Sequence, residues 1–513
     1  MTTITASPDS VRLRDAAADA FQLHVLPAIR TSLPGVEDLL TATVTSSVAY
    51  GAADEHSDLD VFLVFRRERD YRAHAAALGA LIDGLSLDEL YGPICDKGMR
   101  FEIESLPRAD LSRLYHHPEN PDHWHQQSEW LLAWFLDSWP LHDPGGVHAR
   151  MRRLAGTWPP AVLAARQDEA WTRVTTWTAT ALRLLHDEGT TYPAVRAAFR
   201  AATVGLEAAY LCAGRFAPHP KWRESYARRH LAHSPDACRV LASQQQLAEV
   251  LAHPPYRSED LAEALEEHQD RQKPPGDGQE PCLDWHGPLT AASDTFADRH
   301  GRIHLLRRRA PGALVLGAAR AAAHAGETVY LAGETGYDLL LSQRPGYDHS
   351  MRVSEPLRWL HAHGLRGDPA GDTSATENLR WRYLNFVLWR KLRVVDKTRR
   401  RGLHFTCRWY QLQVVDHLLE AETLLAGTHA PPLHRLTRAP RGFTRPPLAG
   451  LLDEARADTG LSDVGAFLSQ GWRDLAGVQD RLVRHRLLDP RDVTDPLAGQ
   501  WDVQYWKYEN LFS

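Results

Sequence analysis

Two aspartates separated by a single residue, Asp58 and Asp60, stand at the start of an apolar run that predicts a β-strand. Side chains two positions apart on a strand point to the same face. The two carboxylates can therefore meet at one point, while Leu59 and Val61 turn into a core. Proteins bind Mg²⁺ through one or two carboxylates together with substrate phosphates. The pair predicts magnesium-dependent phosphoryl chemistry.

A turn of small residues precedes this pair. Ser46, Ser47 and Gly51 follow a short apolar segment and leave the backbone little covered by side chains. Exposed backbone N–H groups in such a turn can approach a triphosphate closely. We therefore expect a nucleotide to bind beside the two aspartates.

Residues Val44–Val64 resemble the signature of the DNA polymerase beta-like nucleotidyltransferases. In that signature a strand is followed by Gly-Ser, a loop with a second Gly, and Ser-Asp-x-Asp leading into a second strand. The matched positions are Ser47, Gly51, Ser57, Asp58 and Asp60. Ser46 departs from the signature, because it stands where the family has Gly and its Cβ can crowd a phosphate.

The resemblance implies two Mg²⁺ ions held by the aspartates and by a third acid on a neighbouring strand. The alternation of apolar and polar residues over Met99–Pro107 predicts such a strand. Glu102, between two apolar residues, is the expected third acid, either as a metal ligand or as the base for the attacking hydroxyl. Glu104 lies on the same face and is the alternative.

The resemblance, for the first half of the chain, and residue patterns, for the rest, predict the fold class and the domain organisation. We expect an α+β catalytic domain, a small mixed sheet with helices, over residues 1–110. Mainly α-helical domains follow, one at 111–271 that closes the active-site cleft and one at 283–513 of unknown role. The polar, Pro- and Gly-rich segment 272–282 is the expected linker. The resemblance covers about residues 9–265.

Hydrophobic spacing predicts the elements of this first half. The expected helices are 9–31, Tyr71–Leu85, Trp130–Trp139, Ala170–Leu185 and Ala194–Leu211, and the expected strands are Ala42–Thr45, Leu59–Phe65 and Arg100–Leu106.

A stretch between the predicted helices, Gly214–Trp222, carries two cations beside aromatic residues. Arg215 and Lys221 can face the nucleotide phosphates or the acceptor, or they can be solvated cations of a loop that packs through Trp222. We include Lys221 with Ser46, Ser47, Gly51 and Ser57 among the expected nucleotide contacts.

The second half gives weaker patterns. We expect helices at Leu289–Arg299 and Ala313–Ala323, a strand at Thr328–Ala332, and a long helical segment at Glu377–Leu424. Cations are dense in and after the last segment, which is typical either of an anion-binding surface or of a solvated helix end. Residues 300–365 contain no Asp-x-Asp on a strand, so we expect no second catalytic centre.

Other chemistries find less support. His116, His117, His123 and His125 are spaced closely enough to share a zinc ion, but no Cys lies nearby and the segment is rich in loop residues. The sequence has no Gly-x-Ser-x-Gly elbow, no Gly-x-Gly-x-x-Gly opening a helix and no Gly-Lys-Ser/Thr loop, which excludes the corresponding hydrolase and nucleotide-binding classes.

Composition is that of an ordinary globular protein of several domains. The 513 residues are 43% hydrophobic and 24% charged, and the net charge of −6 argues against a protein that coats nucleic acid. The five Cys form no Cys-x-x-Cys pair, and no run of about 18 apolar residues occurs. We expect a cytoplasmic protein.

The resemblance, together with the two aspartates, implies a nucleotidyltransferase that moves AMP from ATP to a hydroxyl of a small molecule and releases pyrophosphate. A protein or RNA acceptor is the alternative for the second substrate. A nucleotide-binding regulator without catalytic activity is the alternative for the function, because Ser46 replaces the signature Gly.

Overall fold

The chain folds into two compact units. The first comprises Met1–Arg166 and Tyr210–Ser234, and the second comprises Gln167–Ala209 and Pro235–Ser513. The computed structural model describes residues 7–55, 57–91, 98–106, 111–119, 126–157, 159–188, 192–254, 256–271, 294–297, 303–307, 328–332, 338–341, 373–425 and 461–496. Within these ranges, no helix combines the length and the apolar character needed to cross a membrane.

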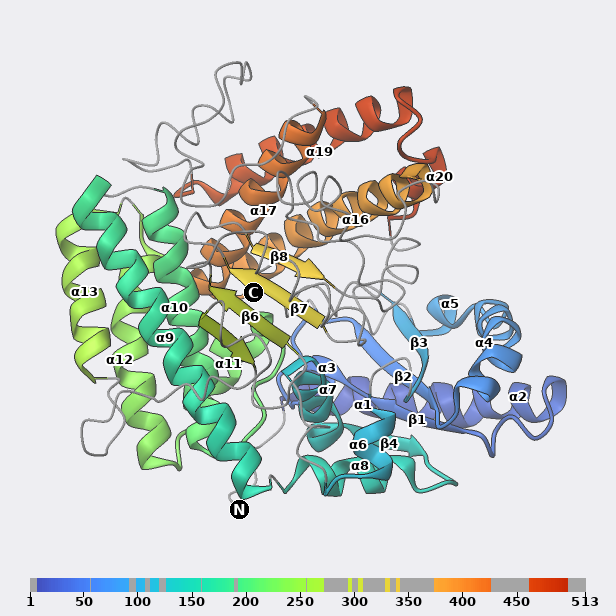
Figure 1. Cartoon of the computed structure of the whole chain (residues 1–513). Coiled ribbons are helices and arrows are strands. Elements are labelled where there is room, and N and C mark those ends of the chain that lie inside the picture. Colours follow the sequence, from blue (N-terminus) through green and yellow to red (C-terminus); the bar gives the residue numbers. More distant parts are fainter. Residues whose placement is uncertain are drawn as a thin grey trace. The chain divides into compact units, whose positions relative to one another are not determined.

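The first unit is built on a four-stranded mixed sheet (Figure 1). Its strands lie in the order β3-β2-β1-β4, with β2 parallel to β3 and the other two pairs antiparallel. The strands are β1 (Leu40–Val44), β2 (Leu59–Phe65), β3 (Met99–Ser105) and β4 (Trp139–His142). The three strands predicted from the sequence are confirmed within two residues at each end.

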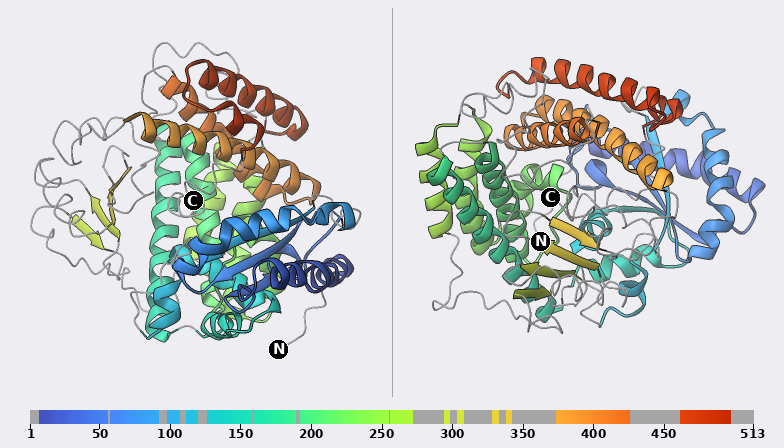
Figure 2. Two further views of the ribbon diagram at one scale, coloured as in Figure 1. Left: turned by 90° about the vertical axis from the view of Figure 1, so that its right-hand side faces the viewer. Right: turned by 45° about the horizontal axis from the view of Figure 1, so that its top comes forward.

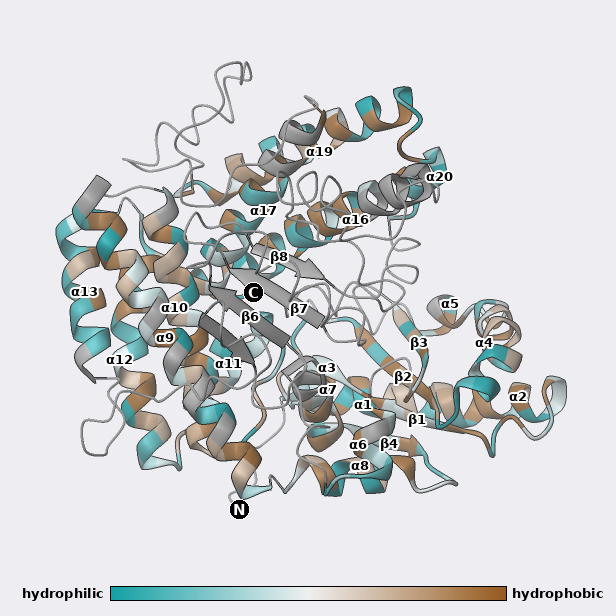
Figure 3. Cartoon of the chain, in the orientation of Figure 1, coloured by the Kyte–Doolittle hydropathy of each residue, from teal (hydrophilic) through white to brown (hydrophobic). Residues whose placement is uncertain are grey.

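Apolar side chains on one face of the sheet form the core of this unit. On β2, Leu59, Val61, Leu63 and Phe65 are buried in it, as the alternation predicts. Figure 3 shows the hydrophobic character of this strand. Burial of this face fixes the register, because a slip of one residue would turn the whole apolar set to the other side.

Helices cover the core. They are α1 (Pro8–Ala20), α2 (Leu26–Ser32), α4 (Glu68–Asp83) and the short α5 (Leu87–Tyr91), with a π-helical segment, Phe21–Val25, joining the first two. The predicted helix over 9–31 is thus confirmed as a continuous helical segment. Ser7 starts it by accepting a hydrogen bond from the Ser10 backbone N–H, with Pro8 in the first turn.

The sheet continues past residue 110, the predicted end of the catalytic domain. Strand β4 pairs with β1 and follows α7 (Gln126–Asp137). The predicted helix Trp130–Trp139 therefore ends at Asp137, and Trp139 belongs to a strand. On the face opposite the core, Phe62 of β2 meets Trp134 of α7 edge to face, with ring centres 6.0 Å apart. The unit also holds α3 (Ser46–Ala49), α6 (Ser112–His116), α8 (Val147–Ala155) and α11 (Pro220–His230).

The second unit combines long helices with a second four-stranded sheet. In Figures 1 and 2 its helices α9, α10, α12 and α13 run side by side. The helices are α9 (Pro160–Glu188), α10 (Tyr192–Cys212), α12 (Pro235–Ala252), α13 (Ser258–Arg271), α16 (Thr373–Arg400), α17 (His404–Leu425), α19 (Val464–Arg484) and α20 (Pro490–Thr494). The first turns of α9 and the last residues of α10 belong to the first unit.

The sheet of the second unit has the order β5-β6-β7-β8, with only β6 and β7 parallel. Its strands are β5 (Asp294–Ala297), β6 (Ile303–Arg307), β7 (Thr328–Ala332) and β8 (Asp338–Leu341). The strand predicted at Thr328–Ala332 is confirmed. The helix predicted at Leu289–Arg299 is wrong at its centre, where β5 pairs with β6. The helix predicted at Ala313–Ala323 lies outside the described residues.

The long helical segment predicted at Glu377–Leu424 is two helices. They are α16 and α17, and the chain turns between them at Gly402, whose φ is +64°. Glycine adopts this left-handed conformation without the penalty of a Cβ, so it ends α16 and lets α17 pack back against it.

A buried histidine makes the stability of the second unit depend on pH. The imidazole of His268 on α13 is fully buried, and this burial lowers its pKa to about 4, although a contact with Ser243 acts in the other direction. In the unfolded chain the pKa is near 6.5, so the unfolded state binds a proton first as the pH falls. We expect the wild type to lose about 3 kcal/mol of stability between pH 7 and pH 4 through this group.

Denaturant unfolding at the two pH values, for the wild type and His268→Gln, measures this loss. The variant should lose less stability than the wild type over the same range. His233→Gln, at an exposed histidine, is the control and should behave as the wild type does. Equal losses in all three proteins would contradict the assignment.

Candidate active site

The predicted phosphate turn and the aspartate pair meet at one end of the first unit's sheet. Strands β1 and β2 are antiparallel, with Val44 opposite Val61, so the end of β1 adjoins the start of β2. The Thr45 backbone N–H donates to the Asp60 carbonyl over 3.0 Å and closes this end of the ladder. Short helix α3, which begins at Ser46, therefore starts beside the strand that carries the aspartates.

Asp60 lies on the face of β2 that is not the core face, and Asp58 directly precedes the strand. Leu59 and Val61 are fully buried in the core, whereas both aspartates are half-buried. This is the alternation that the sequence predicts. Two hard oxygen donors thus stand at the start of one strand.

Glu102 lies on the neighbouring strand, on the same face. Parallel pairing of β2 and β3 sets Arg100 beside Asp60 and Glu102 beside Phe62. Glu102 is therefore diagonal to Asp60, one pleat further from the end of the sheet. Glu104 is buried deeper along β3, and its carboxylate accepts a hydrogen bond from the Ser105 backbone N–H.

The donor set suits magnesium, but the described residues do not assemble three ligands. Among them, no three His, Cys, Asp or Glu side chains form a group that could hold a metal ion. Mg²⁺ needs only one or two protein carboxylates when phosphates and water complete its shell. Asp58 and Asp60 meet that requirement, and Glu102 as a third ligand stays a prediction.

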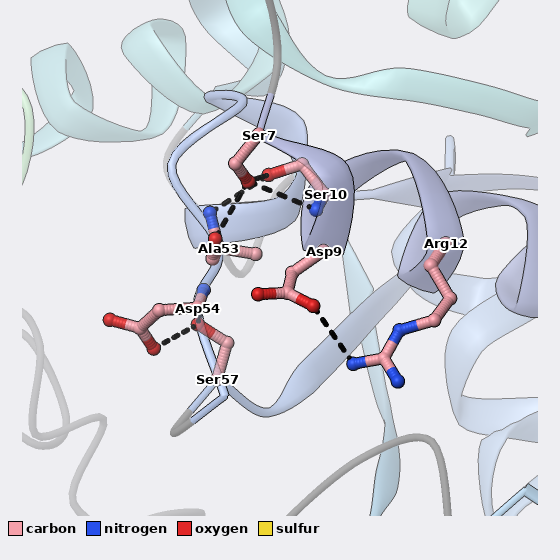
Figure 4. A network of polar contacts seen from close by, with 7 residues as sticks. All are labelled: Ser7, Asp9, Ser10, Arg12, Ala53, Asp54 and Ser57. Carbon is pink, nitrogen blue, oxygen red and sulfur yellow. Dashed lines mark hydrogen bonds and ion pairs between the residues drawn. The ribbon is translucent and has the colours of Figure 1, made fainter.

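The loop between α3 and β2 is tied to the start of α1 by serine hydroxyls (Figure 4). Ser7 donates through its hydroxyl to the Ala53 carbonyl over 2.7 Å, and the Ala53 N–H donates to the Ser10 hydroxyl over 2.8 Å. The Ser7 backbone N–H donates to the Gly51 carbonyl over 3.0 Å. These bonds fix the path of the chain that leads to Asp58.

Ser57 closes the last turn of this loop. Its hydroxyl donates to the Asp54 carboxylate and accepts from the Asp54 backbone N–H, each over 3.0 Å. Ser57 thereby sets the approach to Asp58. Gly51 has a φ of +70° and provides the sharp turn at the end of α3. Contacts of Ser57 and Gly51 with a nucleotide stay predictions.

Ser46, which replaces the signature Gly, has the backbone of a glycine. Its φ is +60°, in the left-handed region that residues with a Cβ rarely adopt. The residue is buried, and its carbonyl accepts the Tyr50 N–H. The backbone therefore bears strain at Ser46.

We expect Ser46→Gly to raise the free energy of unfolding by about 1 kcal/mol, because it relieves this strain. Denaturant unfolding measures the change. Ser46→Ala is the matched control, since it removes the same hydroxyl but keeps the Cβ, and it should give no such gain. If the two variants are equally stable, the strain is not what costs stability here.

Ser47 has a buried hydroxyl. The residue is 0% exposed, and among the described residues its Oγ has no hydrogen-bond partner. A buried hydroxyl without a partner costs about 1–3 kcal/mol. This atom lies in α3, which follows β1 at the end of the sheet where Asp60 stands.

Tyr50, three residues further along the same turn, has a second such hydroxyl. It is 6% exposed, and within the described part of the chain its hydroxyl also lacks a hydrogen-bond partner. Burial raises the pKa of this phenol, and the negative charge of Asp137 adds to the rise. Its ring packs on Tyr226 of α11, with centres 4.4 Å apart, which holds α3 against that helix.

Asp137 and Arg215 form an ion pair close to Tyr50. Asp137 ends α7, two residues before β4, and β4 starts at the same end of the sheet as the aspartate pair. Arg215 Nη2 lies 3.5 Å from Asp137 Oδ1, and both side chains are partly exposed. Burial raises the pKa of Asp137, and the positive charge of Arg215 opposes that rise.

Lys221 stands in the first turn of α11. Its ammonium group lies 5.3 Å from the centre of the Trp222 ring, and its backbone N–H donates to the His219 imidazole. Trp222 is buried, as the packing interpretation of this segment expects. Nucleotide binding by Lys221 stays a prediction.

Sequence reasoning missed Tyr50 and Asp137. Tyr50 stands three residues after Ser47, a spacing that puts both on one side of a turn, and this signal was available. Asp137 gave no local signal, because it reaches the site only through the pairing of β4 with β1.

The structure adds little support for an anion site in the basic segment of α16 or for a zinc site at the histidines near α6. On α16, Asp396 pairs with both Arg399 and Arg400, over 3.0 and 2.6 Å, so part of the basic run is neutralised. His116 and His117 are exposed at the end of α6, and His123 and His125 lie outside the described residues.

Comparison of the sequence with protein-family models and with curated proteins found no match.

Proposed function

We propose that the chain is a metal-dependent nucleotidyltransferase that transfers AMP from ATP to a hydroxyl of a small molecule and releases pyrophosphate. One observation carries the proposal. The buried Ser47 hydroxyl, which has no partner among the described residues, follows β1 directly beside the start of β2, where Asp58 precedes the strand and Asp60 lies on the face away from the core. Resemblance of Val44–Val64 to the nucleotidyltransferase signature supports the same function.

The strand order supports the roles that we propose for these residues. Along this end of the sheet β3, β2, β1 and β4 follow one another, so Glu102 flanks the aspartates on one side and Ser47 flanks them on the other. Asp58 and Asp60 would hold the metal, and Ser47 would donate a hydrogen bond to a phosphate of the nucleotide. When bound, Mg²⁺ supplies charge stabilisation for the attacking and leaving oxygens.

Glu102 accepts the proton of the acceptor hydroxyl. The hydroxyl oxygen then forms a bond to the α-phosphorus of ATP. The bond from this phosphorus to the bridging oxygen breaks, and pyrophosphate leaves with the electron pair. Positioning and electrostatics supply most of the acceleration in such a reaction, because the chain itself forms no covalent bond.

Arg215 and Tyr50 serve the leaving group. Both lie with Asp137 on the Ser47 side of the aspartates, away from Glu102. Arg215 can exchange its long contact with Asp137 for a phosphate, and the Tyr50 hydroxyl can donate beside it. Lys221 is the further cation predicted to contact the triphosphate.

Pyrophosphate release with each of the four nucleoside triphosphates, Mg²⁺ and a panel of hydroxylated acceptors tests the proposal. Release that needs both Mg²⁺ and an acceptor, and that is fastest with ATP, supports it. Tight ATP binding without release across the panel supports the nucleotide-binding regulator instead. Release with an RNA or a protein, and with none of the small molecules, supports the alternative acceptors.

A further inference from the structure

A buried guanidinium joins α10 and α17 in the second unit. Arg196 of α10 is 1% exposed and forms an ion pair with Asp416 of α17 through Nη2. The Tyr192 hydroxyl, one turn earlier, lies 2.9 Å from the other oxygen of the same carboxylate and 2.9 Å from the Leu412 carbonyl. The Asp416 carboxylate reaches the guanidinium through Nη2.

Three buried nitrogen donors near this ion pair have no hydrogen-bond acceptor among the described residues. Among the described residues, Arg196 Nε, Arg196 Nη1 and Trp409 Nε1 are buried and have no hydrogen-bond partner. The guanidinium lies over the Trp409 ring, 4.4 Å from its centre, so the three groups are neighbours. Guanidinium and indole nitrogens donate and cannot accept. A ligand that binds these nitrogens must therefore accept hydrogen bonds.

Two further buried cations lie near Arg196, whose own charge is partly balanced by Asp416. Arg200, one turn along α10 from Arg196, is also buried and lies over the Trp177 ring. Arg408, next to Trp409, is buried too and bonds to the side-chain oxygen of Gln411 and to two backbone carbonyls, all of them neutral. Positive charge held at low dielectric attracts an anion strongly.

We propose that a small oxyanion, a phosphate or a carboxylate group, binds between α10 and α17 and accepts hydrogen bonds from Arg196 and Trp409. This site lies in the second unit and is independent of the proposed transfer reaction. Its occupant satisfies the three donors and balances the positive charge. It thereby stabilises the packing of the two helices, whose aromatic side chains also stack, as Phe199 does on Phe405 with ring centres 5.2 Å apart.

Thermal unfolding of the full chain, titrated with inorganic phosphate against sodium chloride of equal ionic strength, tests the site. The wild type should show a saturable rise of Tm with phosphate and none with chloride. Arg196→Lys keeps the charge but removes the fork of donors, and Trp409→Phe removes one N–H. Each should raise the apparent dissociation constant at least about tenfold. Parallel titrations with sulfate and acetate separate a tetrahedral oxyanion from a carboxylate.

Ser47→Ala separates this site from the proposed nucleotide site. It removes the expected phosphate donor of the first unit and should leave the phosphate response unchanged. A response lost in Ser47→Ala and kept in Arg196→Lys would place phosphate at the nucleotide site and overturn the proposal. An equal response in the wild type and in both second-unit variants would overturn it as well.

Wild-type crystals grown with selenate need no variant to fold. The proposal expects an anomalous peak within hydrogen-bond distance of Arg196 Nε or Nη1. An ordered water there and no anion peak would overturn it, because a water can satisfy the same donors.

Discussion

Asp60→Asn should lower the rate of pyrophosphate release at least about 10³-fold, because it removes half of the charge that holds the metal. Asparagine has almost the same shape as aspartate, so the variant keeps the strand and loses only the anion. Asp60 is half-buried on the face of β2 opposite the core, and its replacement leaves the buried residues on both sides in place. Steady-state release with Mg²⁺, ATP and an active acceptor measures the loss.

Asp83→Asn is the control for this variant. Asp83 is exposed at the end of α4 in the same unit, so the substitution removes one negative charge without touching the site. We expect wild-type rates from it. An Asp60→Asn rate within tenfold of the wild type, in a protein with unchanged circular dichroism, would remove Asp60 from the machinery.

Ser47→Ala should lower kcat/KM on the order of 10²-fold while leaving the ligand-free protein at least as stable as the wild type. The activity falls because a preorganised donor to the transferred nucleotide is lost. Stability holds because the hydroxyl that disappears is buried and has no partner among the described residues. The two effects together identify an atom placed for a ligand.

Ser57→Ala provides the contrast. Its hydroxyl makes two hydrogen bonds with Asp54 within the loop, so its loss should lower the stability of the ligand-free protein by about 1 kcal/mol. Denaturant unfolding and initial rates on both variants separate the two cases. If Ser47→Ala is the less stable of the two, its hydroxyl has a structural partner and the phosphate role fails.

Local pattern was enough to predict the centre of the first sheet. Alternation over Leu59–Phe65 and Met99–Ser105 reflects one buried face, and burial is what fixes a strand. Strand β4 escaped prediction because it is short, contains Pro140 and lies at the edge of the sheet, where a missing N–H is tolerated. The helical spacing of apolar residues also extends to Trp139, so the start of β4 was assigned to the preceding helix.

The error at Leu289–Arg299 has a different cause. Its Ala and Leu content favours a helix, whereas β5 exists because Asp294–Ala297 pairs with residues of β6. Strand preference depends on neighbours across the sheet far more than helix preference does. Helical spacing continues on both sides of Gly402, so the prediction of a helical segment over Glu377–Leu424 did not specify the turn between α16 and α17.

The residues of the candidate site also differ in whether the sequence alone could reveal them. Ser47, Asp58 and Asp60 are recognisable because their spacing is local to one strand–turn–strand unit. Asp137 and Arg215 are brought beside Tyr50 by the fold, from positions far along the chain. A sequence alone does not show such long-range neighbours.

Transfer of label from ATP to an acceptor tests the central claim most directly. The full chain is incubated with Mg²⁺, a metabolite extract and ATP labelled at either the α- or the γ-phosphate. The account predicts that the α-label enters an acceptor, that the γ-label appears in pyrophosphate, and that Asp60→Asn gives neither product. Entry of the γ-label into an acceptor, or identical labelling by the wild type and Asp60→Asn, would contradict it.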